Sequence, residues 1–533
     1  MNWTFPRPFP VHRADVMAAG GVIASAHPLA TSAGVDVLRR GGSFMDAALA
    51  TAAVLNVVEP YNSNLGGDVF MIVHDAATGT VTAINGSGAA PLLATPDRFP
   101  TGRIPGEGLA ATTVPGEVSG WLAAHERWCR WSLADIFASA IRCAEEGFPA
   151  NRDLCRAIAG TQERIAPFPS TRRIFGTPPR PGERWANPDL GRTLRLIAAG
   201  GRRVFYEGQI ADRIAEFCTA NGGLICREDL AAHETQVGPP IATTYRGFTV
   251  CEQPLVSQGH ILVEELNICE GFDFAALDPL SADVAHVGIE AKKLAFADKI
   301  RYSGDPHAGR IPIDMLVSKE FAAVRRREID VGRANPAPEA GRPIDHDTTY
   351  FCVADRDGNA VSFIQSIFAG FGCGVVIDGT GMLMNNRMCG FSLDPASPNV
   401  LVPGKRPVHT LNAYMIFRET PGGLRPYVIG GTPGGDAQVQ TNLQVIEKLI
   451  DYGWSPQEAI EAPRWTSGAR VEVSIESRFP EATLAELRRR GHDLRDAGPF
   501  GGSGHAQAIL VDPESGALIA GSDPRCDGCA MGW

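Results

Sequence analysis

The sequence predicts a mixed fold of helices and strands, of the α/β (α+β) class, on three observations. The 533 residues are 44% hydrophobic and 20% charged, which is typical of a folded protein with a large core. Within residues 62–91 and 348–366, runs rich in β-branched and aromatic side chains flank turn-forming residues, as in β-hairpins. Several longer segments carry apolar residues at helical spacing instead.

From the N-terminus, residues 29–60 predict two helices separated by Gly41 and Gly42. Thr31 or Ser32 can cap the first helix, and Ser43 can cap the second. The second is so rich in Ala and Val that we expect it to be buried on all sides. After the first hairpin, whose loop contains Thr78-Gly79, helical spacing returns in residues 132–147, 211–223, 259–273 and 282–306.

The last third of the chain changes character at Thr348. Strands and turns follow this residue, and helical spacing returns in residues 437–453, 455–465 and 480–491. The one clear seam in composition is residues 331–347, which are polar, rich in proline and directly before Thr348. An exposed approach to a buried strand is a place where a chain can be cut.

Composition argues against several classes of partner. The net charge is −11 and no basic run alternates with aromatic residues, so we expect no nucleic-acid groove and no membrane-surface site. No 18-residue apolar window predicts a spanning helix, and the proline-rich N-terminus does not resemble a signal peptide. Twelve scattered cysteines are typical of reduced thiols, and together these features predict a cytoplasmic protein.

The sequence predicts neither a metal site nor a cofactor. Cys526 and Cys529 have CxxC spacing, but no second pair accompanies them. Several histidines stand alone in the sequence, where packed or solvated roles are commoner than metal ligation; these are His27, His74, His260 and His505.

A cut directly before Thr348 would make this threonine an N-terminal residue with useful chemistry. Its own α-amine, with a reference pKa of about 7.7 to 8.0, would be partly unprotonated near neutral pH and could take the hydroxyl proton. Before the cut, the same hydroxyl can attack the carbonyl of Asp347 and give an ester that water opens. One residue would then supply nucleophile and base, and the protein would mature itself.

Residues 428–440, VIGGTPGGDAQVQ, are the best candidate for an oxyanion hole. An apolar strand runs into a glycine-rich turn and then a helix, so the N–H groups of Gly434 and Gly435 can face a ligand at a helix N-terminus. A phosphate-binding loop is the rival interpretation. The Lys-Ser/Thr pair of such loops is absent, and Asp436 would repel an anion.

In these residues the chain resembles the γ-glutamyltransferase family of N-terminal nucleophile hydrolases, and most closely its oxamate amidohydrolase-like branch. Matching motifs occur in family order, among them NLGGDVF, TTVPGEVSGW, EAKKLAFADKIRYSGDP, DTTYFCVADRDGNAVSF, PGKRPVHTLNA and GGTPGGD. The resemblance covers residue 20 to the end. It implies a four-layer αββα sandwich, and self-cleavage of one precursor into a large subunit, 1–347, and a small subunit, 348–533, which together form one structural domain.

The resemblance also implies roles for single residues. Thr348 is the nucleophile, Gly434 and Gly435 form the oxyanion hole, and Ser366 falls where the family has a hydroxyl that positions the nucleophile. Thr410 falls in a loop that usually presents two serines near the scissile amide, and His409 replaces the other serine. A packed core role for His409 is the alternative.

The chain departs from the family where γ-glutamyl enzymes hold the donor. The arginine that binds the donor carboxylate aligns with Ser87, and the three ligands of the donor ammonium align with Phe368, Arg387 and Gly390. Two like charges about 4 Å apart repel by roughly 4 kcal/mol at an effective dielectric constant of about 20, so Arg387 should select against an ammonium. A carboxylate suits Arg387 well. An ion pair of Arg387 with a nearby Asp is the structural alternative.

The sequence therefore predicts a self-processing amidohydrolase for a small carboxylate-bearing amide such as oxamate. The alternatives are a γ-glutamyl hydrolase or transferase acting on glutathione-like donors, a side-chain acylase, and an unprocessed binding protein. The expected partners are a small-molecule substrate and the two subunits of one precursor. Further dimerisation stays open.

Self-cleavage gives the first testable prediction. The purified protein should give two bands on a denaturing gel, which share the 56.8 kDa chain in proportion to length as about 37 and 20 kDa. Thr348→Ala removes the attacking hydroxyl and should leave one band. Continued cutting of the variant at the same bond would show that an external protease does the work.

Overall fold

The computed structural model describes residues 11–337 and 348–533, so Asp347 and most of the predicted seam lie outside the described residues. Both predicted hairpins are present and are neighbours in one antiparallel sheet. The first hairpin is β3 (Asp68–Asp75) with β4 (Thr80–Gly86), and the second is β10 (Thr349–Asp355) with β11 (Ala360–Ser366). β11 pairs with β3, so hairpins far apart in the sequence lie side by side.

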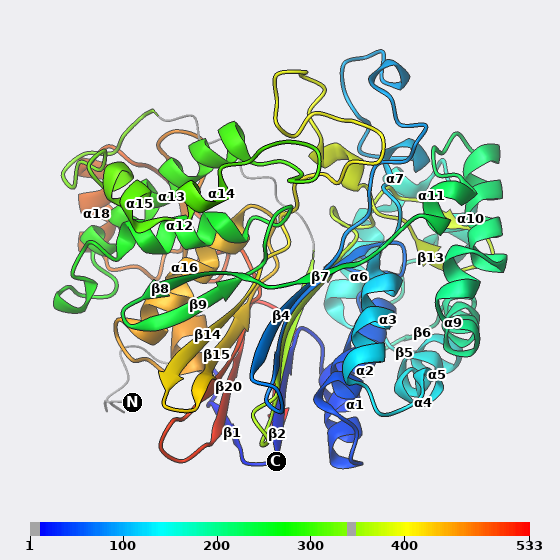
Figure 1. Cartoon of the computed structure of the whole chain (residues 1–533), viewed down its shortest axis with the longest axis horizontal. Helices are drawn as coiled ribbons and strands as arrows, with labels where there is room; N and C mark the ends of the chain where they lie inside the picture. The colour runs from blue at the N-terminus through cyan, green and yellow to red at the C-terminus, as the bar shows by residue number, and fades with distance from the viewer. Residues whose placement is uncertain (1–10, 338–347) are drawn as a thin grey trace.

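Two seven-stranded sheets pack face to face in the middle of the molecule (Figure 1). The first has the order β21-β2-β10-β11-β3-β4-β7, and its other strands are β21 (Cys529–Gly532), β2 (Gly21–Ser25) and β7 (Gln236–Gly238). The second has the order β1-β20-β19-β15-β14-β9-β8; its strands are β1 (Val16–Ala18), β20 (Leu518–Ser522), β19 (Gln507–Val511), β15 (Gly423–Gly431), β14 (Ala413–Thr420), β9 (Phe248–Glu252) and β8 (Ile241–Tyr245).

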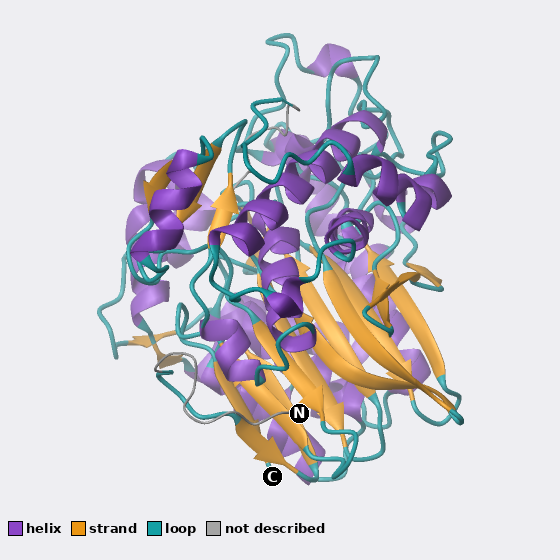
Figure 2. Cartoon of the chain, turned by 90° about the vertical axis from the view of Figure 1, so that its left-hand side faces the viewer, coloured by secondary structure: helices purple, strands orange, loops and turns teal. Residues whose placement is uncertain are grey.

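Helices cover the outer face of each sheet. Figure 2 views the molecule over one of these helical layers, with the strands behind and beside it. The first sheet is covered by helices that include α1 (Pro28–Arg39), α2 (Phe44–Val58), α3 (Glu117–Trp128), α5 (Ala138–Glu146) and α9 (Pro188–Tyr206). The second is covered by α12 (Gly259–Cys269), α13 (Ala282–Tyr302), α16 (Ala437–Ile450) and α17 (Pro456–Glu461). The predicted αββα sandwich is confirmed.

Smaller elements complete the described chain. The helices are α4 (Leu133–Ile136), α6 (Arg152–Gly160), α7 (Gln162–Ile165), α8 (Pro169–Phe175), α10 (Gln209–Ala220), α11 (Arg227–Ala231), α14 (Ile313–Leu316), α15 (Lys319–Arg326) and α18 (Glu481–Arg489). The strands are β5 (Phe148–Pro149), β6 (Arg184–Trp185), β12 (Val376–Ile377), β13 (Met382–Leu383), β16 (Trp465–Ser467), β17 (Glu472–Ile475) and β18 (Asp493–Asp496). Among the helices described, none is long and apolar enough to cross a bilayer.

Of the two predicted helix caps, the one at Ser43 is confirmed and the one at Thr31 or Ser32 is wrong. Ser43 caps α2 in a capping box with Asp46, and every residue of α2 is buried, as its composition predicts. The prediction that Thr31 or Ser32 caps α1 is wrong, because α1 begins earlier, at Pro28, and His27 accepts the capping hydrogen bond. Proline at the first helical position has its φ already set for a helix, which explains the earlier start.

Candidate active site

Thr348 lies at the end of the second hairpin, directly before β10, and is 2% exposed. Since Thr349 pairs with Gln365, Thr348 stands beside Ser366 at the end of β11. Its Oγ1 donates a hydrogen bond to Ser366 Oγ at 3.1 Å. The backbone N–H of Phe368 donates to the same oxygen at 2.8 Å. These are the contacts that the predicted positioning role of Ser366 requires.

Gly434 and Gly435 form the turn between β15 and α16. Their φ angles are +122° and +56°, in the region that glycine adopts without strain. Neither N–H donates a hydrogen bond to any described residue. Gly434 lines the same cavity as Thr348. Adjacent free N–H groups at this turn are what an oxyanion hole needs.

A cavity of about 550 Å³ opens beside Thr348. Thr348 and Gly434 come from motifs that the sequence analysis singled out, but the fold assembles the rest of the wall from segments that are far apart in the sequence. Sequence reasoning therefore missed most of the polar side chains that line the cavity, and it interpreted His505 as an isolated histidine. The polar lining consists of Glu59, Asn62, Asp153, Arg156, Ser503, His505 and Arg525. The lining carries charges of both signs.

Arg387 is buried between an acidic partner and an aromatic ring. Its Nε donates to Asp68 Oδ2 at 3.2 Å, and neither side chain is exposed. Its guanidinium carbon lies 4.3 Å from the centre of the Phe368 ring. Within the described chain, its outer nitrogens Nη1 and Nη2 have no hydrogen-bond partner. The ion pair that the sequence offered as an alternative exists, but it uses only Nε and leaves Nη1 and Nη2 unpaired. Arg387 is buried and is not among the residues that line the cavity containing Thr348.

Phe368 reaches this position through an unusual backbone. Its φ is +81°, a region that is strained for a bulky side chain. In this conformation its N–H points to Ser366 and its ring lies against Arg387. Such strain persists where the surroundings fix the residue from several sides. Phe368 thus connects the predicted nucleophile to the buried guanidinium, and Gly390 closes the short 3₁₀ turn that begins at Arg387.

His409 packs in the core beside the same cluster. It has no exposed surface, and its ring centre lies 5.1 Å from that of Phe70. Neither of its ring nitrogens, nor Thr410 Oγ1, has a hydrogen-bond partner among the described residues. Burial lowers the pKa of His409 well below its usual range, and Arg387 and Arg406 lower it further. The ring is therefore neutral near pH 7 and offers one donor and one acceptor.

Ser87 stands at the position that aligns with the donor-binding arginine of the family, and a different arginine, Arg406, contacts it. Arg406 Nε donates to the Ser87 carbonyl at 3.0 Å, and Nη2 donates to the Glu234 carbonyl at 2.7 Å. The Ser87 hydroxyl donates to Asn85 Oδ1 at 2.5 Å. Sequence reasoning missed Arg406, although it lies in the PGKRPVHTLNA motif.

The charges of the cluster favour an anion. Burial raises the pKa of Asp68 to about 6, while Arg387 and the N–H of Gly88 lower it. Burial also lowers the pKa of Arg387, and Asp68 opposes this. Arg406 has other acidic neighbours, Asp305 and Glu234, so the charge that lacks full compensation is that of Arg387, whose Nη1 and Nη2 are unpaired. Beside these nitrogens a negative charge would be better accommodated than an ammonium.

One group of side chains has the composition of a metal site. The ligand atoms of His286, Glu290 and His492 lie within 4.8 Å of one another, although the sequence predicted no such cluster. These side chains already have partners. His286 Nδ1 lies 2.8 Å from His492 Nε2, and the carboxylate of Glu290 forms an ion pair of 2.5 Å with Lys293. A metal ion would have to displace both interactions, so these contacts favour a packed polar network.

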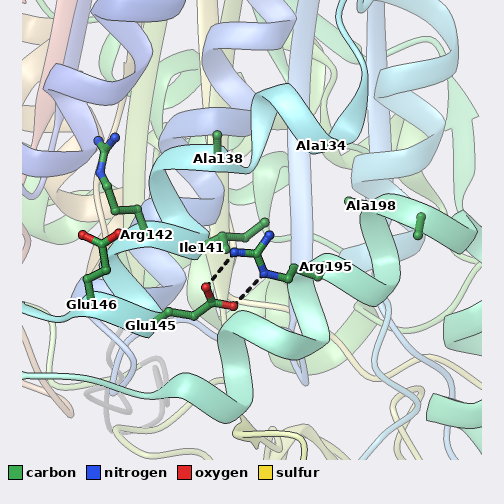
Figure 3. Close-up of a pocket in the computed structure, with 9 residues that line it drawn as sticks. Ala134, Ala138, Ile141, Arg142, Glu145, Glu146, Arg195 and Ala198 are labelled. Atoms are coloured by element: carbon green, nitrogen blue, oxygen red, sulfur yellow. Dashed lines mark hydrogen bonds and ion pairs between the residues drawn. The ribbon is translucent and has the colours of Figure 1, made fainter.

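A second cavity, of about 410 Å³, lies between α5 and α9 (Figure 3). It shares no lining residue with the cavity at Thr348. Arg195 donates two hydrogen bonds of 2.7 Å to Glu145 across it, as the dashed lines show. Its other charged side chains, Arg142 and Glu146, are exposed to solvent, so this groove lacks the buried unpaired polar groups that mark the cluster around Arg387.

Comparison with known proteins covers almost the whole chain. The family model described as Gamma-glutamyltranspeptidase matches residues 30–533. The chain belongs to this γ-glutamyltranspeptidase family. The resemblance noted in the sequence is confirmed, and the protein is an amidohydrolase of the N-terminal nucleophile type.

Three relatives within or near this γ-glutamyltranspeptidase family illustrate its range. The glutathione hydrolase-like YwrD proenzyme of Bacillus subtilis (strain 168) is 39% identical, over 97% of this chain and 99% of its own. The oxamate amidohydrolase proenzyme of Klebsiella pneumoniae subsp. pneumoniae is 36% identical, over 98% of this chain and 100% of its own. The crystal structure of cephalosporin acylase from Bacillus halodurans superposes with a TM-score of 0.91 at 38% identity, covering 100% and 99% of the two chains.

The buried Glu59 in the cavity predicts a pH-dependent stability. Burial raises its pKa to about 7, opposed by the side chains of Thr349 and Asn62. Between its ordinary pKa and about 7, the folded state binds more protons than the unfolded state, so the free energy of unfolding falls as pH rises. In uncleaved Thr348→Ala protein, adding Glu59→Gln should therefore stabilise the fold by about 2 to 3 kcal/mol at pH 8 and by little at pH 4.5.

Denaturant unfolding at the two pH values measures this difference. Glu481→Gln, on the surface of α18, controls for the loss of one carboxylate. An equal effect of Glu59→Gln at both pH values would show that Glu59 is ionised throughout.

Proposed function

We propose that the protein is a self-processing amidohydrolase that hydrolyses the amide of a small carboxylate-bearing substrate of the oxamate type. One observation carries the choice of substrate. The outer nitrogens of Arg387 are buried without a partner, next to the residues that hold Thr348. A buried cation with unsatisfied donors is costly unless a ligand completes it, and a carboxylate matches both donors at once.

The proposed maturation cuts the chain between Asp347 and Thr348. The Thr348 hydroxyl attacks the carbonyl of Asp347, the peptide nitrogen leaves as the new α-amine, and water opens the resulting ester. The products are a large subunit, 1–347, and a small subunit, 348–533. The proenzyme names of the Bacillus and Klebsiella relatives support this step.

In the mature enzyme the α-amine of Thr348 takes the proton from Oγ1 as the oxygen attacks the substrate amide. Negative charge then develops on the former carbonyl oxygen, where the N–H groups of Gly434 and Gly435 stabilise it. The resulting α-ammonium returns its proton to the leaving nitrogen, and an ester remains on Thr348. Water attacks this ester by the same route and releases the acid.

The Arg387 cluster would set the choice of donor. Arg387 binds the substrate carboxylate through Nη1 and Nη2, while Asp68 holds Nε and Phe368 supports the plane of the guanidinium. The neutral His409 and the Thr410 hydroxyl supply further hydrogen bonds to the ligand. A γ-glutamyl donor, with an ammonium beside its carboxylate, would bring that ammonium close to the Arg387 guanidinium and is disfavoured.

A side-chain acylase is the second candidate, and the size of the cavity favours it. Oxamate releases ammonia, which leaves a volume of about 550 Å³ beside Thr348 largely unused. A larger amine would fill it, and a cephalosporin acylase has nearly the same fold. An amidase screen with oxamate, malonamate, succinamate, γ-glutamyl-p-nitroanilide and a β-lactam side-chain amide separates the candidates.

Arg387→Gln tests the assignment of the donor site. Self-cleavage should continue, because it involves Thr348 and its own preceding peptide. The specificity constant for a carboxylate-bearing amide should fall roughly ten- to hundredfold, or about 1.5 to 3 kcal/mol for a hydrogen bond to a charged group. Residual activity on γ-glutamyl donors should improve as repulsion is relieved.

Two controls separate binding from scaffolding. Arg387→Lys keeps a cation beside Asp68 but loses the paired donors, so it should lose activity with a smaller loss of stability. Arg246→Gln breaks a 2.8 Å ion pair with Asp451 elsewhere in the fold and should leave kcat/KM unchanged. A wild-type preference for γ-glutamyl-p-nitroanilide that Arg387→Gln does not alter would make Arg387 a scaffold residue.

A further inference from the structure

Gln258 connects two loops that meet at the active site. It precedes α12 and has no exposed surface. Its Nε2 donates to the carbonyl of Thr410 at 2.7 Å and to the carbonyl of Gly435 at 3.1 Å. One amide group therefore joins the loop of Thr410 to the turn that carries the proposed oxyanion hole.

Lys299 on α13 completes this connection. Its Nζ donates to Gln258 Oε1 at 3.0 Å and pairs with Asp436, the residue directly after Gly435. The carbonyl of Gln258 is thus bound to a cation, while its N–H groups face two backbone carbonyls. A carboxamide suits this place because it accepts at one end and donates twice at the other.

The turn at Gly434 and Gly435 needs contacts that restrict its backbone conformation. Consecutive glycines with positive φ have many accessible backbone conformations, and holding one of them costs more entropy than for other residues. A bound Gly435 carbonyl fixes the plane of the peptide that follows it. The lysine contact to Asp436 fixes the next residue, at the start of α16.

We infer that Gln258, held by Lys299, is a positioning residue that keeps the oxyanion turn in its catalytic conformation. The inference rests on the proposed function, because it takes Gly434 and Gly435 as the oxyanion hole. Gln258 and Lys299 precede the proposed cleavage site, whereas Thr410 and Gly435 follow it. The large subunit would therefore hold part of the catalytic machinery of the small subunit in place.

Gln258→Met tests this role, because methionine has similar length and cannot donate to either carbonyl. Gln444 offers a matched control: its buried amide donates to the carbonyls of Gln440 and Trp465, each at 2.9 Å, and accepts from the Trp465 N–H at 3.0 Å. Both variants lose a buried amide with two donated bonds. Gln258 alone of the two contacts the oxyanion turn.

We expect kcat of Gln258→Met to fall roughly ten- to hundredfold, the scale of a small misplacement of catalytic groups, with KM little changed. Gln444→Met should lose a similar amount of thermal stability but keep kcat. Amide hydrogen exchange in residues 432–437 should increase in Gln258→Met and not in Gln444→Met. Lys299→Met should also lower kcat and increase amide hydrogen exchange in residues 432–437. It replaces Gln258→Met as the test variant if Gln258→Met does not fold.

The inference is overturned if the two glutamine variants lose kcat equally, or if exchange in residues 432–437 is the same in both. The assay uses whichever amide the wild-type enzyme hydrolyses in the screen above. If the wild-type enzyme hydrolyses none of them, the proposed function fails, while the exchange comparison still decides whether Gln258 holds the turn.

Discussion

The register of β11 against its two neighbours is the constraint on which the site depends. Ser366 stands opposite Asp68 on β3, and on its other side it receives the hydrogen bond of Thr348. Successive side chains of a strand point to opposite faces, so a slip of one residue would turn the Ser366 hydroxyl away from Thr348. Packing on both faces opposes such a slip, as in the stacked rings of Phe351 and Phe363, 4.4 Å apart.

The same register places a charge in the core. Asp68 pairs with Ser366, the residue that contacts the proposed nucleophile Thr348, and Asp68 also forms an ion pair with Arg387. Buried ion pairs of this kind often contribute little to stability, because the free energy lost when both charges leave water is similar in size to the free energy of their attraction. A guanidinium with two unsatisfied nitrogens is less favourable still. The arrangement is therefore better explained by a ligand than by stability.

Local chemistry made part of this predictable from the sequence. The turn residues between Asp355 and Asn359 define the hairpin, and counting outward from them places Thr348 opposite Ser366. The Ala and Val content of α2 likewise predicts its burial. The pairings of Arg387 with Asp68 and of Ser87 with Arg406 were not predictable, because each spans 319 residues of the chain. Contacts of that span follow from how the sheets pack, and no local pattern encodes them.

The sheet also explains why a cut before Thr348 need not disturb the site. β10 lies between β2, from the proposed large subunit, and β11, from the small one, while β11 in turn pairs with β3 of the large subunit. Because β21 also pairs with β2, three ladders of hydrogen bonds join the two parts in this sheet, and β1 with β20 and β9 with β14 join them in the second sheet. Neither part can leave without breaking these ladders. The new α-amine would stay attached to a strand held along both edges. Cleavage can then change the chemistry of Thr348 while the surrounding fold keeps its hydroxyl against Ser366.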